Sequence, residues 1–242
     1  MVNNILALQS EEWNTESVFD FSHKYVGGGV TSESRNTLQS VLRSALTTFP
    51  AEFDAKALTN ATYMFYNCYN IESIPLIDTS NCTDFSYMFS GCQALTSVPQ
   101  LDTSKGTTFR SMFNNCEALT TIPPLDTSNG TECRFMFDAC RSLTSLGTDS
   151  LTDADGNLVK PWQFKVSIDF GYCPLDKTSI ECVMNNLQTV SSTQTLTISK
   201  TTALNICGQT DKSYDYTSDT HYLEMMSVCT SKGWKVAVET SH

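Results

Sequence analysis

The sequence predicts an α/β solenoid of short parallel strands and short helical turns, with a helical cap at the N-terminal end and a β-α-β-α-β cap at the C-terminal end. The first observation is a Met-Phe pair that recurs every 24 residues. The pairs are Met64-Phe65, Met88-Phe89, Met112-Phe113 and Met136-Phe137. A cysteine follows each Phe after three residues, at Cys68, Cys92, Cys116 and Cys140. A period of 20–50 residues with apolar positions in constant phase is typical of stacked repeats.

Other positions keep the same phase and predict one continuous core. Apolar residues recur six and nine positions after each Phe, at Ile71, Leu95, Leu119 and Leu143, and at Ile74, Val98, Ile122 and Leu146. An acidic residue also recurs, at Asp54, Asp78, Asp102 and Asp126. Since one coil of this length buries little by itself, stacking must create the core, and the phase must therefore be kept.

The chain before the repeats divides into two segments. Residues 1–31 do not fit the period and contain the run Gly27-Gly28-Gly29, which predicts an extension with a hinge. This extension is a candidate for docking onto a larger assembly. In residues 32–50 the apolar positions 38, 41, 42, 45 and 46 have helical spacing. Because a stack of repeats must cover its open end, we expect this helix to be the N-terminal cap.

Four repeats occupy residues 51–148, and each is expected to have three parts. A segment such as Leu95-Thr96-Ser97-Val98 predicts a short strand with its hydroxyl residues outward and its aliphatic residues inward. The Asp102-Thr103-Ser104 segment predicts a turn, because Asp and Ser side chains bond their own backbone. The stretch Phe85–Phe89 predicts one or two helical turns that pack Phe and Met inward.

Residues 149–242 predict an α/β segment that closes the C-terminal end. A polar turn over 152–157 precedes an alternating strand over 162–170. A helix over 175–188, a strand over 196–198, a helix over 218–231 and a strand over 234–238 follow. Gly233 is expected to end the second helix, because glycine is favoured just beyond helix C-termini. We expect these elements to act as larger coils that continue the sheet of the repeats.

Charge and hydropathy exclude several classes of function. The formal net charge of −11 and the pI of about 4.6 argue against nucleic acid, which needs a basic stripe. No run of about 18 apolar residues is present, so we expect no membrane insertion. The first twelve residues lack a basic segment and a long apolar core, so they do not read as a signal peptide.

Ten cysteines suggest a disulfide framework, but their phase favours another interpretation. The four repeat cysteines occupy one equivalent position, and Cys82 and Cys133 replace glycine and phenylalanine of other repeats. Free cysteine is commonly buried, so we expect reduced, structural thiols. Disulfides remain the alternative, chiefly among Cys173, Cys182, Cys207 and Cys229.

The sequence offers no convincing catalytic or metal site, and we expect a protein without enzymatic activity or cofactor. No motif pairs a cysteine with any of the three histidines, His23, His221 and His242, as nucleophilic catalysis requires. No Cys-x-x-Cys motif for zinc is present. Asp153-Ala154-Asp155-Gly156 resembles a calcium loop, but Leu151 and Trp162 would occupy its first and last ligand positions.

Two further polar patterns have ordinary explanations. Stacked coils would bring Asp78, Asp102 and Asp126 within about 5 Å of one another, and a cation would relieve their repulsion. We favour the alternative that each Asp caps its own turn. The sequons at Asn60, Asn81 and Asn129 are expected to be turn residues.

The best candidate for a binding surface is a ladder with one polar pair in each coil. It consists of Glu72 and Ser73, Thr96 and Ser97, Thr120 and Thr121, and Thr144 and Ser145. Solenoids bind extended partners through such regular faces. The competing interpretation, that this polar strand face only keeps the sheet soluble, has equal weight on the sequence alone.

These residues together resemble the BspA-like leucine-rich repeat surface proteins found in gut-bacterial and phage proteins. The shared unit is Leu-Asp-Thr-Ser-Asn-x-Thr-x-Met-x-x-Met-Phe-x-x-Cys-x-x-Leu-Thr-x-Ile-Pro, seen here at 77–99, 101–123 and 125–146. Cys173-Pro174-Leu175 and Lys232–Val236 are similar to the segment that follows such repeats. The resemblance implies a leucine-rich repeat fold, surface adhesion and no shared catalytic residues.

The resemblance also sets the functional expectation. We expect a non-enzymatic adhesion module that recognises a protein or carbohydrate on a host or particle surface through the repeat face. Bacterial members commonly carry an export signal that residues 1–12 do not show, which favours a virion over a secreted adhesin, with a cytoplasmic location as the alternative. The alternative function is a structural tail or capsid-decorating protein that has no ligand and docks through residues 1–31.

Overall fold

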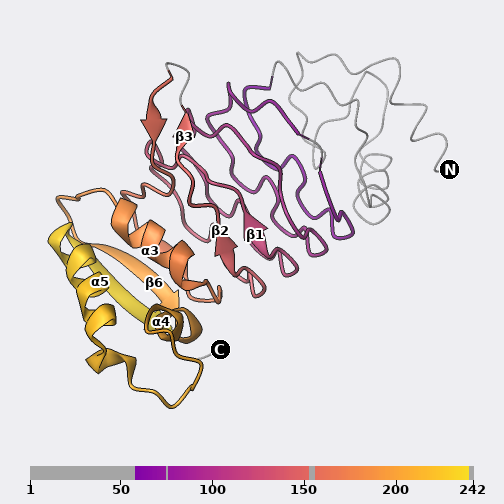
Figure 1. Ribbon diagram of the computed structural model, residues 1–242. Coiled ribbons are helices and arrows are strands. Elements are labelled where there is room, and N and C mark those ends of the chain that lie inside the picture. Colours follow the sequence, from indigo (N-terminus) through magenta and orange to yellow (C-terminus); the bar gives the residue numbers. More distant parts are fainter. Residues whose placement is uncertain (1–57, 75, 153–155, 240–242) are drawn as a thin grey trace, which may run out of the picture.

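The computed structural model describes residues 58–74, 76–152 and 156–239, and it has mixed α/β architecture with short strands and few helices. Stacked loops with two short strands form the N-terminal part of the described chain, and helices packed on a small sheet form the C-terminal part (Figure 1). The expected extension (1–31), the expected capping helix (32–50) and Asp54 lie outside the described residues.

Successive repeats lie directly on one another, joined by backbone hydrogen bonds. The Phe65 amide donates to the Met88 carbonyl (2.7 Å), and the Phe89 amide donates to the Met112 carbonyl (2.9 Å). On another side of the coil, strand β1 (Thr121–Ile122) pairs in parallel with β2 (Ser145–Leu146). The 24-residue period of the sequence is therefore also the offset between stacked coils.

The prediction of short helical turns over residues such as 85–89 is wrong, because these segments are chains of tight turns. The Met88 amide donates locally to the Phe85 carbonyl (3.2 Å), but the Tyr87 amide donates to the Arg110 carbonyl of the next coil (2.9 Å). A helix would satisfy every interior amide within itself. Here alternate amides are needed between coils, and Tyr87 adopts a left-handed φ of 58° to turn the chain.

The in-phase apolar residues form the core, as predicted. Each Met-Phe pair from Met64-Phe65 to Met136-Phe137 is completely buried. The rings of Phe65, Phe89, Phe113 and Phe137 are stacked, with successive centroids 5.4, 5.5 and 5.9 Å apart. Such offset stacks add to the stabilisation that comes from the buried area alone.

The segment after the repeats contains most of the regular structure. Its elements are the antiparallel hairpin of β3 (Leu151–Thr152) and β4 (Leu158–Val159), then β5 (Ile168–Phe170), α3 (Lys177–Asn186), β6 (Gln194–Ser199), α4 (Lys200–Ile206), the 3₁₀ turn η1 (Tyr216–Ser218), α5 (Thr220–Ser231) and β7 (Trp234–Glu239). The strands β5, β6 and β7 pair in this order and are all parallel. Gly233, with a φ of 87°, follows α5 as expected.

Three expectations for this segment need correction. The strand predicted over 162–170 shortens to β5, because Trp162 turns the chain with a left-handed φ of 58°. The helix α4 was not predicted, so the order is β-α-β-α-α-β, with η1 before the last helix. The three strands also form a sheet of their own, separate from β1 and β2.

The C-terminal segment nevertheless continues the core of the repeats. The Phe170 ring stacks on Phe137 with centroids 4.6 Å apart, and the Cys173 amide donates to the Phe170 carbonyl (2.9 Å) as the Cys140 amide does to Phe137. Phe170-Gly171-Tyr172-Cys173 is thus a fifth Phe-x-x-Cys rung. The spacing of 33 residues from Phe137 hides it from a search for the 24-residue period.

Candidate binding surface

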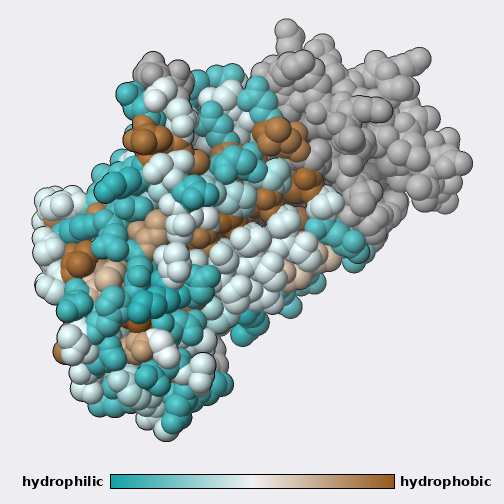
Figure 2. Space-filling model, in the orientation of Figure 1, coloured by the Kyte–Doolittle hydropathy of each residue, from teal (hydrophilic) through white to brown (hydrophobic). Residues whose placement is uncertain are grey.

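The eight predicted binding residues form one surface, which we call the strand face. Ser97 pairs with Thr121 in a parallel bridge, and Thr121 pairs with Ser145 across β1 and β2. Seven of the eight side chains are exposed, and Ser145 is half-buried. Figure 2 shows a pale, weakly polar surface over β1 and β2, as expected for serine and threonine. The structure thus brings the predicted residues together.

The inner column of the strand face uses its hydroxyl groups within the protein. The column consists of Glu72, Thr96, Thr120 and Thr144. Thr96 Oγ1 donates to the Glu72 carbonyl (3.4 Å), and Thr120 Oγ1 donates to the Thr96 carbonyl (3.2 Å). Thr144 Oγ1 continues the ladder to the Thr120 carbonyl (3.3 Å). These threonines therefore hold neighbouring coils together.

The outer column offers free polar groups. It consists of Ser73, Ser97, Thr121 and Ser145, and among the described residues no protein group bonds these four hydroxyls. Each can donate one hydrogen bond and accept two. Since parallel coils set them about 5 Å apart, they form a regular row of donors and acceptors. Of the seven predicted hydroxyl side chains, these four are the ones without a partner in the described protein.

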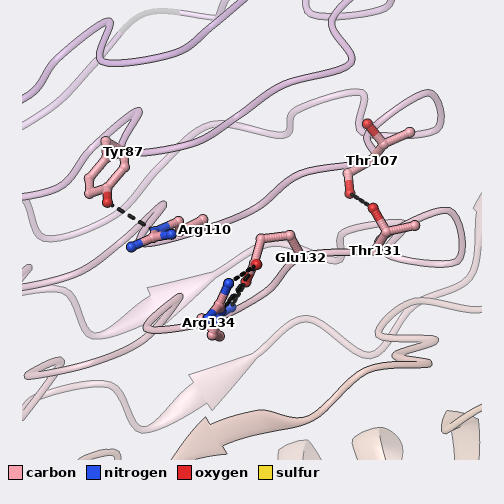
Figure 3. A network of polar contacts seen from close by, with 6 residues as sticks. All are labelled: Tyr87, Thr107, Arg110, Thr131, Glu132 and Arg134. Atoms are coloured by element: carbon pink, nitrogen blue, oxygen red, sulfur yellow. Dashed lines mark hydrogen bonds and ion pairs between the residues drawn. The ribbon is translucent and has the colours of Figure 1, made fainter.

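A second threonine ladder lies on another side of the coils and was not predicted. Thr107 Oγ1 donates to the Thr83 carbonyl (3.1 Å), and Thr131 Oγ1 donates to the Thr107 carbonyl (3.1 Å; Figure 3). The three threonines are 24 residues apart, which was a usable signal. Because their hydroxyls bond the neighbouring coil, they have a structural role like that of the inner column.

The aspartate ladder caps turns, as favoured from the sequence. Asp78 Oδ1 accepts bonds from the Ser80 amide (3.0 Å) and hydroxyl (2.6 Å), and these bonds hold the pKa of the Asp78 carboxyl below its usual range. Asp102 accepts the same two bonds from Ser104. Within the described residues no group of His, Cys, Asp and Glu is arranged to hold a metal ion.

All ten cysteines are free thiols, and the repeat cysteines connect coils. The thiols of Cys92, Cys116 and Cys140 donate to the carbonyls of Phe65, Phe89 and Phe113, at 3.1, 3.1 and 3.0 Å. Burial raises the pKa of the Cys140 thiol to about 12 and that of Cys116 well above its usual range. Thiols held protonated in this way are poor nucleophiles.

The only histidine in the described part of the chain, His221, serves a helix contact. Its Nε2 lies 2.5 Å from Glu181 Oε1, which joins α5 to α3. Lys177 also approaches Glu181, at 3.7 Å. His23 and His242 lie outside the described residues.

A turn side of the repeats carries aromatic and arginine side chains that were not among the predicted binding residues. The Tyr63 and Tyr87 rings are stacked with centroids 4.7 Å apart, and Tyr66 meets both edge-on, at 5.2 and 6.2 Å. Arg110 Nε donates to the Tyr87 hydroxyl (3.0 Å), and Arg134 pairs with Glu132 (Figure 3). The signal was an aromatic residue one position before Met at 63, 87 and 135.

Comparison with known proteins adds one similarity. Residues 35–150 match a family described as "Mycoplasma protein of unknown function, DUF285". No curated protein and no solved structure matches the chain. None of the helices among the described residues has the length and apolarity to cross a membrane. The matched residues 35–150 include all eight residues of the strand face.

Proposed function

We propose that the chain is a non-enzymatic binding module that recognises a protein or glycan through the strand face. The observation that carries the proposal is the outer column, Ser73, Ser97, Thr121 and Ser145, whose hydroxyls lie in a row without partners in the described protein. Buried polar groups need partners, but a row of exposed hydroxyls is ready to bond an extended ligand.

The architecture supports this proposal. We infer that the repeats form a leucine-rich repeat solenoid of the BspA-like kind, since coils stack at a 24-residue offset and bury Met, Phe, Cys and Leu in columns. A solenoid presents an extended, regular face because each repeat adds one identical rung. The resemblance of the repeat unit to BspA-like surface proteins further favours a module displayed on a phage particle or a bacterial surface.

The test measures binding before and after the outer column is blocked. The wild-type chain would be applied to immobilised fibronectin, fibrinogen, collagen and mucin and to an array of defined glycans. The double variant Ser97→Arg/Thr121→Arg places two bulky cations in the middle of the column. We expect it to weaken binding to any ligand found by at least tenfold.

A control variant separates blocking from a general effect of added charge. Ser227 is exposed on α5, which packs against α3, α4 and β7, so Ser227→Arg with an unchanged urea midpoint should bind like wild type. The proposal is wrong if the wild-type chain binds none of these probes, or if the strand-face variant binds as well as Ser227→Arg. A virion protein with only a structural role would give the first of these results.

A further inference from the structure

Four positions recur at one corner of each pair of neighbouring coils. In the first two repeats they are residues 63, 66, 87 and 90. Tyr63, Tyr66 and Tyr87 pack against one another there, and the Arg110 guanidinium lies 6.0 Å from the centre of the Tyr87 ring. Each of the three rings lies against the other two, and all three residues are half-buried.

Forty-eight residues later the same positions hold Ser111, Asn114, Phe135 and Asp138. The backbone register is equivalent, since the Ser111 amide donates to the Arg134 carbonyl (2.9 Å) as the Tyr87 amide donates to Arg110. Ser111 has no ring to offer, and among the described residues no ring lies against Phe135. Phe135 is consequently 53% exposed.

Neither backbone geometry nor stability explains a phenylalanine at this position. Phe135 has a left-handed φ of 58°, which costs a residue with a Cβ atom about 1 kcal/mol. The other left-handed column of the coils has Asn67, Gly91 and Asn115, which favour this conformation, and ends with Ala139, which does not. Tyr63, Tyr87 and Ser111 share this conformation, so it belongs to the whole column. Phe135 differs from the two tyrosines because its ring is exposed and gains little from folding, and this exposed ring is the reason to look for a ligand.

The polar groups beside this ring suit a sugar. Asn114 Nδ2 donates to Asp138 Oδ2 (3.2 Å), and this pair still has an acceptor and a donor to offer. By register, Asn114 stands beside Phe135 as Tyr66 stands beside Tyr87. A pyranose has an apolar C–H face and a rim of hydroxyls, which match a ring face bordered by an amide and a carboxylate.

The charge of the chain and the small size of this surface limit the kind of ligand further. Arg134 is neutralised by Glu132, with contacts of 2.7 and 3.0 Å, and the chain as a whole carries a net charge of −11. An acidic polymer would be repelled, whereas a neutral one would not. A protein interface would need roughly 800 Å² with an apolar centre, and a single exposed ring does not supply that.

We propose that Phe135, Asn114 and Asp138 form a subsite for one neutral hexose unit of a polysaccharide. The proposal shares with the proposed function only that the chain is a binding module, because the subsite lies on the turn side and not on the strand face. The Phe135 ring is the platform, and the amide–carboxylate pair binds the hydroxyl groups at the edge of the sugar.

Affinity electrophoresis tests this directly. The chain would be run through native gels that contain yeast mannan, barley β-glucan or dextran, with polygalacturonate as the acidic comparison. We expect retardation in at least one neutral gel and none in polygalacturonate. Phe135→Ala should reduce the affinity at least tenfold, and Phe135→Trp should keep it. Alanine is tolerated in this conformation, since Ala139 has a φ of 59°.

Three further variants keep the result unambiguous. Ser111, which is buried, takes the position that Tyr63 has beside Tyr87. Ser111→Tyr should therefore place a ring against Phe135, and a variant with an unchanged urea midpoint should lose retardation. Leu223→Ala removes another exposed apolar side chain, on α5, and should be retarded like wild type. Retardation that Ser97→Arg/Thr121→Arg abolishes and Phe135→Ala leaves intact would assign the polysaccharide to the strand face and overturn this subsite.

The proposal fails if no neutral gel retards the wild-type chain, if only polygalacturonate does so, or if Phe135→Ala is retarded like Leu223→Ala. A protein ligand whose binding needs Phe135, together with no retardation in the neutral gels, would also overturn it and assign the site to protein recognition.

Discussion

The Cys116 thiol donates a hydrogen bond to the Phe89 carbonyl, 3.1 Å away in the preceding coil. The same carbonyl accepts the Cys92 amide at 3.0 Å, so it closes a turn in its own coil and joins the next coil. Equivalent bonds run through Cys92, Cys140 and, at 3.6 Å, Cys173. The cysteine of each repeat is therefore a small apolar residue that also donates a hydrogen bond between coils.

Removing one rung of this ladder should weaken the protein measurably. We expect Cys116→Ala to lower the free energy of unfolding by about 1–2 kcal/mol, because it removes a buried sulfur and its bond but leaves the Phe89 carbonyl one donor. Cys207→Ala, at a half-buried cysteine, should cost less than about 0.5 kcal/mol. Urea denaturation measures both, and equal costs would show that the ladder adds no stability.

The buried thiols should also make the protein sensitive to alkali. Burial raises the pKa of Cys140 to about 12 from an unfolded value near 8.5–9, so the folded state holds a proton that the unfolded state releases. The stabilisation is complete below about pH 9 and is lost as the pH rises towards 12. The slope is about 1.4 kcal/mol per pH unit for each such thiol.

The variant Cys140→Ala isolates that contribution. Other groups, including Tyr222 with a pKa raised to about 12, also favour unfolding at high pH and remain in both proteins. The free energy of unfolding of the variant should therefore fall less steeply than that of wild type between pH 9 and 11. Parallel curves in urea titrations at several pH values would contradict the prediction.

The period in the sequence predicted what the core contains but not the path of the backbone. Phe85, Met88 and Phe89 are spaced like one face of a helix, and residues three or four apart also fall on the same side of a chain of tight turns. The left-handed residue that distinguishes the two, Tyr87, has a side chain with no preference for that conformation. The sequence did contain a signal for left-handed turns at Asn67, Gly91 and Asn115, since asparagine and glycine favour that conformation.

The strand face was also predicted only in part. Its position followed from the phase of Thr96, Ser97 and their equivalents. The sequence did not predict which of its hydroxyls remain free, because Thr120 Oγ1 donates to a carbonyl of another coil, that of Thr96. The helix α4 was not predicted because it begins directly after β6. Its only start signal is Ser199, whose hydroxyl accepts a hydrogen bond from the Thr202 amide.

Gly91 should be costly to replace. Its φ is 81°, and a Cβ atom there would lie 2.2 Å from Asn67 Oδ1. We expect Gly91→Ala to cost about 2–3 kcal/mol, from the left-handed backbone and from displacement of Asn67. Gly156 has a φ of 82° with nothing near its Cβ position, so Gly156→Ala should cost only about 1 kcal/mol. Thermal unfolding that shows no difference between the two would exclude the contact with Asn67 as a constraint.

The junction between the repeats and the C-terminal segment should depend on Phe170. Its ring is fully buried and stacks on Phe137 at 4.6 Å, so it covers the last repeat. We expect Phe170→Ala to lower the free energy of unfolding by about 3–5 kcal/mol, because the ring leaves a cavity between two packed units. Phe135→Ala is the matched control, since that ring is largely exposed, and it should cost less than about 1 kcal/mol. Urea denaturation followed by tryptophan fluorescence measures both, because Trp162 lies against Phe137, with centroids 6.3 Å apart. If Phe170→Ala were no more costly than Phe135→Ala, the repeats would not need the C-terminal segment as their cover.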